Sequence, residues 1–340
     1  MLFPNWQYPT VRSFRSMLPR LLVLAGAVAL AACDSTESPL DPANESAPIE
    51  APADAVAPAD GLAALTTSRI AFASYSGMLS DIYLMDAQGT NRTRLTSWAG
   101  TEFAPSWSYD HKRVAMVRFR TDAANAQHFD IYVMNADGTN KHWAKSYTST
   151  FNIMDPSWSP DGSRLVVTVI LQNLPYVATL NLATGQLALV WATGGSYMQG
   201  EDPSYDPTGQ KIVYVGPGHT TVDLVVPGGP HLVPVSSTTR VGDPTFSPDG
   251  KKIAYSQIAT GSFNNYEIYV RTLATGVVTR LTNNGKVDGE PSWSPDGTRI
   301  AFSSDRSGRA QIWTMNSGTG GGLVRITNSS RDEAEPAWYH

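Results

Sequence analysis

The sequence Pro-Ser-Trp-Ser-Pro-Asp-Gly at residues 291–297 recurs along the chain in related forms. The other copies begin at Pro105, Pro156, Pro203, Pro244 and Pro336, and successive copies lie 41 to 51 residues apart. A repeat of this period is typical of modular arrays in which each copy forms one small structural unit. The repeat alone therefore predicts a modular architecture for this chain.

One unit predicts four short strands. Residues 291–294 alternate small and aromatic side chains, and residues 295–297 predict a tight turn in which glycine accepts a positive φ. Further strands are expected at 299–303, 311–315 and 323–327. A four-stranded antiparallel sheet of this size cannot bury both faces alone, so the units must stack. The repeat aromatics are expected in the core between units: Trp107, Trp158, Tyr205, Phe246, Trp293 and Trp338.

The two ends of the array complement each other. It opens at residues 68–72 with a second strand and ends at residues 336–340 with a first strand. Together they make one unit, which predicts an all-β, six-bladed β-propeller of four-stranded antiparallel blades over residues 65–340, closed by the C-terminal strand. Closure removes the open edge that a linear array would expose. The third and fourth units depart most from the repeat, and residues 227–234 predict an irregular outer strand.

Residues 1–32 have the pattern of a bacterial lipoprotein signal peptide. The apolar run at residues 21–32 follows three arginines and is too short to span a bilayer as a helix. It ends in Leu-Ala-Ala-Cys at residues 30–33, which resembles the lipobox at which cysteine receives a diacylglyceryl group. Cys33 is the only cysteine of the chain, so we expect its lipidation. The alternative is an ordinary cleavable signal followed by a chance cysteine.

Residues 33–64 predict a tether. They are rich in proline, alanine and acidic residues and contain no aromatic residue, lysine or arginine. Such a composition cannot bury enough apolar surface to fold, so a disordered and extended segment is expected. The rest of the chain has no basic patch, which argues against a nucleic-acid partner.

The repeat resembles that of TolB-type propellers. The resemblance covers residues 68–340 and rests on Pro-x-Trp-Ser-Pro-Asp-Gly, on Arg-Ile-Ala-Phe-Ser-Ser-Asp-Arg at residues 299–306, and on the later Ile-Trp/Tyr-x-Met and Leu-Thr motifs. It implies a six-bladed propeller in the bacterial envelope that binds other envelope proteins, as TolB binds the peptidoglycan-associated lipoprotein. TolB carries an α/β domain before its propeller and is not lipid-anchored, so the specific partner does not carry over.

The sequence contains no recognised catalytic or cysteine-based metal motif. Some propeller lyases of acidic sugars gather histidines around a metal. The histidines of this chain share no repeat position and are expected on loops and the surface: His111, His128, His142, His219, His231 and His340.

The residue before each repeat proline is acidic in five of six copies: Asp155, Asp202, Asp243, Glu290 and Glu335, with Ala104 in the remaining copy. In a propeller the first strand of each blade lines the central channel, so these carboxylates are expected to form a ring near one channel mouth. One interpretation is a binding site for a basic segment or for a cation such as calcium. The other is structural: each carboxylate accepts backbone N–H groups and joins neighbouring blades.

These observations predict a monomeric, lipid-anchored protein of the bacterial cell envelope that faces the periplasm or the exterior. Its propeller is expected to act as a protein-binding or scaffold module for envelope proteins or cell-wall components. Its contact with the membrane is expected through the lipid on Cys33. The alternative is a propeller enzyme, a polysaccharide lyase or hydrolase that uses the channel face. No cofactor is predicted.

Overall fold

The computed structural model describes residues 68–121, 127–145 and 152–339. All of them belong to the second of two compact units, Ala55–His340. The predicted signal peptide, Cys33, the tether and His340 lie outside the described residues. Within the described ranges, no helix is long and apolar enough to cross a membrane.

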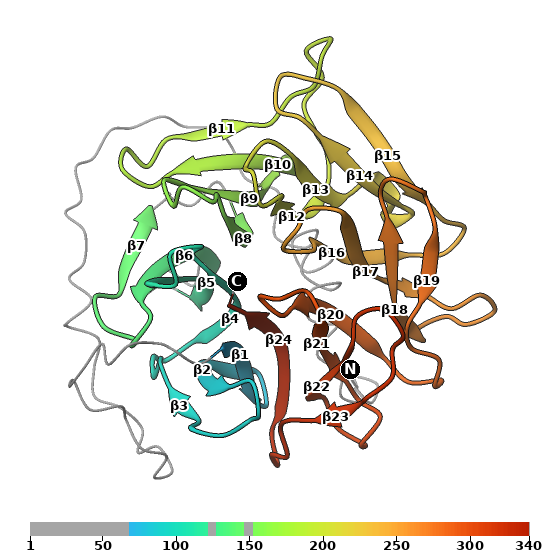
Figure 1. Cartoon of the computed structure of the whole chain (residues 1–340). Helices are drawn as coiled ribbons and strands as arrows, with labels where there is room; N and C mark the ends of the chain where they lie inside the picture. The colour runs from blue at the N-terminus through green and yellow to red at the C-terminus, as the bar shows by residue number, and fades with distance from the viewer. Residues whose placement is uncertain (1–67, 122–126, 146–151, 340) are drawn as a thin grey trace, which may run out of the picture. The chain divides into compact units, whose positions relative to one another are not determined.

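Six four-stranded sheets surround a common centre (Figure 1). Within each sheet the neighbouring strands are antiparallel. A single parallel bridge, Ser80 to Thr101, joins the first two sheets. The innermost strands of the blades are β4, β8, β12, β16, β20 and β24 (Figure 1). The predicted all-β propeller of four-stranded blades is therefore confirmed.

The strands of each blade are given from the centre outward. Blades one and two are β24 (Asp332–Trp338), β1 (Arg69–Ser76), β2 (Leu79–Asp86), β3 (Thr93–Arg94), and β4 (Thr101–Trp107), β5 (Arg113–Thr121), β6 (Gln127–Asn135), β7 (His142–Lys145). Blades three and four are β8 (Asn152–Trp158), β9 (Arg164–Leu171), β10 (Leu174–Asn181), β11 (Leu187–Leu189), and β12 (Glu201–Tyr205), β13 (Ile212–Val215), β14 (Thr221–Val225), β15 (His231–Ser236), with the 3-10 helix η3 (Pro217–His219) after β13. Blades five and six are β16 (Val241–Phe246), β17 (Lys252–Ile258), β18 (Tyr266–Thr272), β19 (Val278–Arg280), and β20 (Asp288–Trp293), β21 (Arg299–Ser304), β22 (Gln311–Asn316), β23 (Val324–Arg325).

The C-terminal strand completes the first blade, as the sequence predicts. β24 pairs antiparallel with β1, and Ile70 lies opposite Trp338. The backbone N–H of Tyr339 also donates to the carbonyl of Arg69 at 3.0 Å. The irregular strand expected near residues 227–234 is present as β15, whose pairing with β14 shifts register between Val222 and Leu224.

The repeat aromatics are buried between blades, as predicted: Trp107, Trp158, Tyr205, Phe246, Trp293 and Trp338. Trp293, for example, packs with Ala254 and Ile268 of the preceding blade. Indole N–H groups also donate across the blade boundary. Trp158 Nε1 bonds to the carbonyl of Ser106 at 3.0 Å. Burying a large ring and satisfying its N–H at one boundary stabilises each blade against its neighbour.

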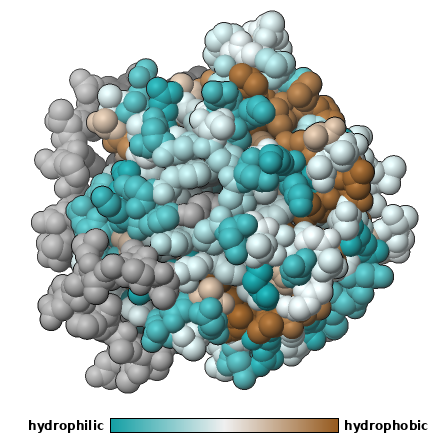
Figure 2. Space-filling model, viewed as in Figure 1, coloured by the Kyte–Doolittle hydropathy of each residue, from teal (hydrophilic) through white to brown (hydrophobic). Residues whose placement is uncertain are grey.

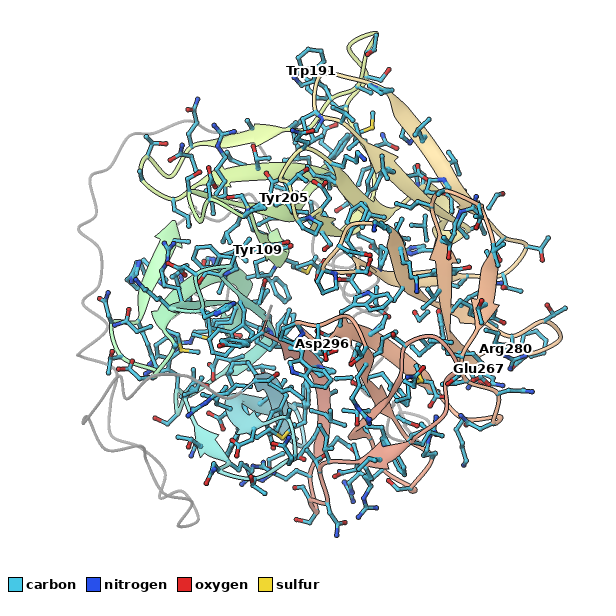
Figure 3. All side chains as sticks on the ribbon, in the orientation of Figure 1. Tyr109, Trp191, Tyr205, Glu267, Arg280 and Asp296 are labelled. Carbon is cyan, nitrogen blue, oxygen red and sulfur yellow. The ribbon has the colours of Figure 1, made fainter. Side chains whose placement is uncertain are left out.

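The Ser-Pro-Asp-Gly turns are held by their own side chains. Ser294 Oγ donates to Asp296 at 2.6 Å, and the same carboxylate accepts the backbone N–H of Thr298 at 3.0 Å (Asp296 is labelled in Figure 3). In the equivalent turn, the hydrogen bond from Ser159 is the main reason that the pKa of Asp161 falls to about 2. These aspartates are therefore turn residues, because hydrogen bonds to the charged form fix the turn.

The burial of Trp338 gives a direct test of closure. Trp338 is 4% exposed, whereas Phe263 is 99% exposed. We expect Trp338→Ala to lower the free energy of unfolding by about 3–5 kcal/mol, the usual cost of removing a buried large aromatic ring. Phe263→Ala, the control at an exposed aromatic ring, should change it by less than about 0.5 kcal/mol. Urea denaturation of both variants measures the difference, and equal midpoints would show that β24 does not close the ring in solution.

Candidate functional site: the inner ring of acidic residues

The residue before each repeat proline adopts a left-handed backbone conformation. Each inner strand changes its register with the next strand at this point, which is the mark of a β-bulge. The φ angles lie between 50° and 56° for Ala104, Asp155, Asp202, Asp243, Glu290 and Glu335. Positive φ is costly for residues other than glycine, so surrounding contacts must hold these six residues, which we call the inner ring.

Carboxylates of the inner ring bond to the next blade. Asp243 Oδ2 accepts the backbone N–H of Glu290 at 3.2 Å. Glu290 Oε2 accepts the N–H of Glu335 at 2.8 Å, and Glu335 Oε2 accepts the N–H of Ala104 at 2.5 Å. One hydrogen-bonded chain thus crosses three successive blade boundaries. The structural role that the sequence offered as one interpretation is present in these bonds.

Hydroxyl groups on the second strand of a blade support the same contacts. Ser303 Oγ donates to Glu290 at 2.6 Å, and Ser256 Oγ donates to Asp243 at 2.8 Å. Thr168 Oγ1 accepts the backbone N–H of Asp202 at 3.2 Å. The bulged backbone is therefore fixed by side chains from its own blade and from the preceding one.

The inner ring is not uniformly accessible. Glu290 is 8% exposed and Glu335 is 6% exposed, whereas Asp155, Asp202 and Asp243 are half-buried. The structure joins Asp243, Glu290 and Glu335 through the bonds above. Asp155 and Asp202 occupy the equivalent bulge positions in blades three and four. The three aspartates are consequently the members that a ligand reaches most readily.

A second acidic set lies three residues before the repeat proline, and sequence reasoning missed it: Glu102, Asp288 and Glu333. All three are completely buried. Each lies beside an arginine: Arg118 Nε is 3.5 Å from Glu102, Arg306 Nη2 is 2.7 Å from Asp288, and Arg92 pairs with Glu333. In the sequence, these acids share only their position three residues before the repeat proline. That position is acidic in three of the six copies.

The arginines of this second set lie against aromatic rings. The guanidinium of Arg92 is 4.4 Å from the ring centre of Tyr83. Arg118 is 4.7 Å from Trp98, and Arg306 is 5.1 Å from Trp313. Arginine suits this position because its planar guanidinium stacks on a ring while it donates to a carboxylate.

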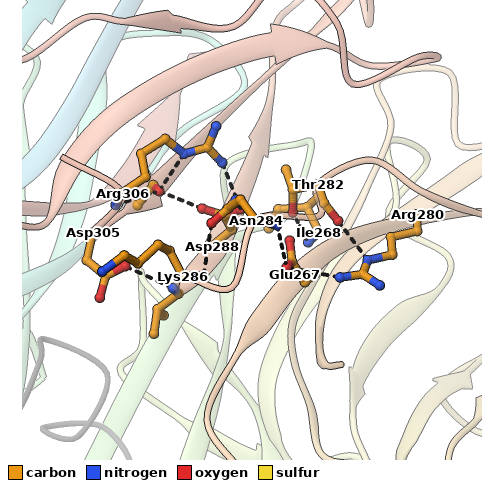
Figure 4. A network of polar contacts seen from close by, with 11 residues as sticks. Glu267, Ile268, Arg280, Thr282, Asn284, Lys286, Asp288, Asp305 and Arg306 are labelled. Carbon is orange, nitrogen blue, oxygen red and sulfur yellow. Dashed lines mark hydrogen bonds and ion pairs between the residues drawn. The ribbon is translucent and has the colours of Figure 1, made fainter. Parts of the chain in front are cut away.

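A polar network connects blades five and six at the start of β20 (Figure 4). Arg280 Nη2 and the backbone N–H of Asn284 both donate to Glu267 Oε1, each at 3.0 Å. The side-chain amide of Asn284 then bonds to Asp288, which Arg306 holds from the other side. The connection between the two blades is therefore fixed by buried charged groups, whose removal one at a time would leave an unpaired partner.

Burial controls protonation in this second set. Burial, and then the nearby charge of Asp81, raise the pKa of Glu102 from 4.5 to about 8. Arg118, whose Nε lies 3.5 Å from Glu102, opposes this shift but does not outweigh the effect of burial. Burial also raises the pKa of Asp288, despite its bonds from Arg306 and Ser304. A buried carboxyl group that is easily protonated is more suited to holding the fold than to attracting a soluble cation.

The described histidines are spread over different blades and loops. His128 and His142 lie on β6 and β7, and His111 stacks on Tyr339 with ring centres 3.8 Å apart. Two pair with carboxylates: His219 Nδ1 is 2.9 Å from Glu201, and His231 Nε2 is 3.0 Å from Asp223. Among residues 68–121, 127–145 and 152–339, no group of three or more His, Cys, Asp or Glu side chains is placed to hold a metal ion.

The raised pKa of Glu102 predicts how stability depends on pH. Because the folded protein binds this proton more tightly than the unfolded chain does, the contribution of Glu102 to stability is complete below pH 4.5 and is lost as the pH rises through about 8. We expect Glu102→Gln to remove a slope of about 1.4 kcal/mol per pH unit within that window. Urea titrations at successive pH values measure it. Asp249→Asn is the control, since the pKa of Asp249 is lowered and its titration lies below the window. Parallel curves for wild type and Glu102→Gln would contradict the assignment.

Comparisons with known proteins agree with this geometry. Residues 203–340 match the family model described as the TolB beta propeller domain. The "Protein TolB homolog" of Chlorobium luteolum is 32% identical over 125 residues, which are 36% of this chain and 27% of that protein. The "Tol-Pal system protein TolB" of Francisella tularensis subsp. mediasiatica is 25% identical over 206 residues, which are 58% of this chain and 45% of that protein. The chain thus spans less than half the length of these curated relatives.

A solved structure shows the same fold over more of the chain. The crystal structure of TolB from Acinetobacter baumannii superposes with a TM-score of 0.67 at 24% identity, and the match covers 80% of this chain and 66% of that one. The repeat, the six blades and these likenesses together show a β-propeller with the fold of the TolB propeller, and its residues 203–340 match the TolB beta propeller domain.

Proposed function

We propose that this protein is a lipid-anchored component of the bacterial envelope whose propeller binds other envelope proteins. The TolB-like propeller is the observation that carries the proposal. Curated relatives from Francisella tularensis are Tol-Pal system proteins, so the likeness favours an envelope partner. Propellers present a broad rigid surface, and binding needs no chemistry beyond what such a surface offers.

The anchor in this proposal is the lipid on Cys33. The apolar run, the small residues before the cysteine and the absence of any other cysteine all support it. Each buried methylene of an acyl chain contributes about 0.8 kcal/mol, so a cysteine carrying several chains holds a protein stably on a membrane. The proposed location is the envelope, on the periplasmic or outward-facing side.

The proposed contact for a partner is the accessible part of the inner ring. Asp155, Asp202 and Asp243 gather negative charge on neighbouring inner strands. Such a site suits a lysine or arginine side chain of a partner, or a cation such as calcium, which prefers oxygen ligands. The buried members Glu290 and Glu335 each accept a backbone N–H of the next blade and hold its inner strand in place.

The anchor is tested by Cys33→Ser. The thioether to the lipid needs sulfur, so we expect the variant to lose incorporated palmitate completely and to move from the detergent phase to the aqueous phase. Metabolic labelling with palmitate and Triton X-114 partitioning measure the two effects. Undiminished labelling of the variant would refute the lipoprotein assignment.

The inner ring is tested by Asp155→Asn combined with Asp202→Asn. Crosslinking and affinity capture from cells producing the lipidated protein should recover at least tenfold less of a basic envelope partner with the double variant. Its thermal midpoint should stay near that of wild type, which separates lost binding from lost folding. An unchanged set of captured proteins would place the partner elsewhere on the propeller.

One observation favours the enzyme alternative. His219 and Glu201 form a histidine–carboxylate pair, and Glu201 begins the inner strand β12 beside Asp202. Such a pair can serve as a general base in polysaccharide cleavage. Incubation of the protein with polygalacturonate and with peptidoglycan, followed by product analysis, decides the matter. Products made by wild type and lost in His219→Ala would support an enzyme, and no product from either polymer would leave the binding role.

A further inference from the structure

The outer edge of the third blade departs from the repeat. After the three-residue strand β11, the chain makes a hairpin in which Trp191 lies opposite Tyr197 in an antiparallel bridge. The returning arm then pairs with β10, where Gln199 lies opposite Tyr176. The hairpin therefore widens this blade beyond its short outer strand β11.

Strand alternation divides the side chains of this edge into two faces. Val177, Val190 and Met198 point inward and are buried in one core cluster. Their neighbours along each strand must point the other way, because successive side chains in a strand alternate. The outward set, which we call the aromatic strip, is Tyr176, Trp191, Tyr197 and Gln199. Trp191 is 47% exposed and Tyr197 is 58% exposed.

The aromatic strip is braced before any ligand arrives. The backbone N–H of Thr193 donates to the carbonyl of Gly229 at 2.7 Å, and that of Gly228 donates to the carbonyl of Trp191 at 2.8 Å. Gly228 has φ 75°, and a side chain there would meet the Trp191 ring. Gln199 Nε2 donates to the Tyr176 hydroxyl at 3.2 Å. A surface held by a neighbouring blade loses little conformational entropy on binding.

The stretch of sequence that carries the aromatic strip contains no charged residue. From Leu165 to Gly200 the sequence contains no Asp, Glu, Lys, Arg or His. The projecting loop at the top of the view, where Figure 3 labels Trp191, is almost white in Figure 2 and is thus neither strongly polar nor strongly apolar. Residues 165–200 therefore offer no charged side chain to a ligand recognised by charge, such as a nucleic acid or an anionic headgroup.

We propose that the aromatic strip binds a neutral polysaccharide chain. A pyranose ring has an apolar face of C–H groups that stacks on a flat aromatic ring, and hydroxyl groups at its edge that bond to amides and phenols. Tyr197 and Trp191 are direct cross-strand neighbours, about 4.5–5.5 Å apart at Cβ, and Tyr176 lies diagonally at about 7–8 Å from Tyr197. The rings therefore offer a stacking surface longer than one sugar, with Gln199 and the tyrosine hydroxyls as the polar groups.

The polysaccharide is a second ligand of the proposed envelope protein. This proposal rests on the proposed function only because a protein in the envelope is exposed to glycans. The position of the aromatic strip on the outer edge of blade three separates it from the inner ring. The lipid anchor takes no part in it. The two proposals therefore fail independently.

Purified full-length Cys33→Ser protein, free of lipid, provides the test. Chitohexaose and cellohexaose are the neutral probes, and hexameric galacturonate is the charged one; isothermal titration calorimetry measures each affinity. We expect at least one neutral probe to bind. Trp191→Ala with Tyr197→Ala should weaken it at least tenfold, and Gln199→Ala should weaken it less. Phe263→Ala is the matched control, because Phe263 is 99% exposed on the β17–β18 hairpin and should leave affinity unchanged.

Each outcome of this experiment either supports or overturns the polysaccharide proposal. Binding of neither neutral probe, preference for the charged probe, or unchanged affinity in the double variant would each overturn the proposal. A thermal midpoint of the double variant equal to that of wild type ensures that lost affinity reflects lost contact. Should the double variant unfold, Trp191→Phe supplies the second measurement: weakened binding by the folded single variant supports the strip, and unchanged binding overturns it.

Discussion

The rest of the propeller depends on hydrogen bonds between the inner strands of neighbouring blades, such as the one from the backbone N–H of Glu335 to the carboxylate of Glu290. It brings two inner strands of different blades together at the point where each strand is bulged. Without such bonds the left-handed residues would be left strained, at a cost of order 1–3 kcal/mol each. A carboxylate is strong enough as an acceptor to hold this conformation, since charge-assisted bonds are about twice as strong as neutral ones.

This constraint limits what the same residues can do for a ligand. A carboxylate that already accepts N–H and hydroxyl groups, as Glu290 does, has few free lone pairs for a partner. The half-buried aspartates of blades three, four and five are the more exposed members of the inner ring. Blades six, one and two hold the buried acid–arginine pairs instead. The more exposed aspartates and the buried acid–arginine pairs therefore lie in different halves of the propeller.

Much of this was predictable from the repeat. The period, the turn residues and the incomplete units at 68–72 and 336–340 predicted the blades, the buried aromatics and the pairing of β24 with β1. The sequence also singled out the acids that precede five of the six repeat prolines, but not their positive φ, because a bulge arises from pairing between strands and leaves no local signal. Glu102 and Glu333 escaped notice because their partners, Arg118 and Arg92, come from non-equivalent places in the repeat. The outward direction of Trp191 depends on the pairing register of an irregular hairpin, which composition does not reveal.

The pairing of Ile70 with Trp338 joins segments at opposite ends of the described chain. Such a contact is among the most expensive in loop entropy, and it raises the mean sequence separation of contacts, which slows folding. Blades two to six can form from local hairpins, whereas β1 keeps a bare edge until its partner arrives. During that interval the edge is open to pairing with another chain, which is an aggregation hazard. A protein built in this way gains from a cellular factor that shields unpaired strands until synthesis of the last strand is complete.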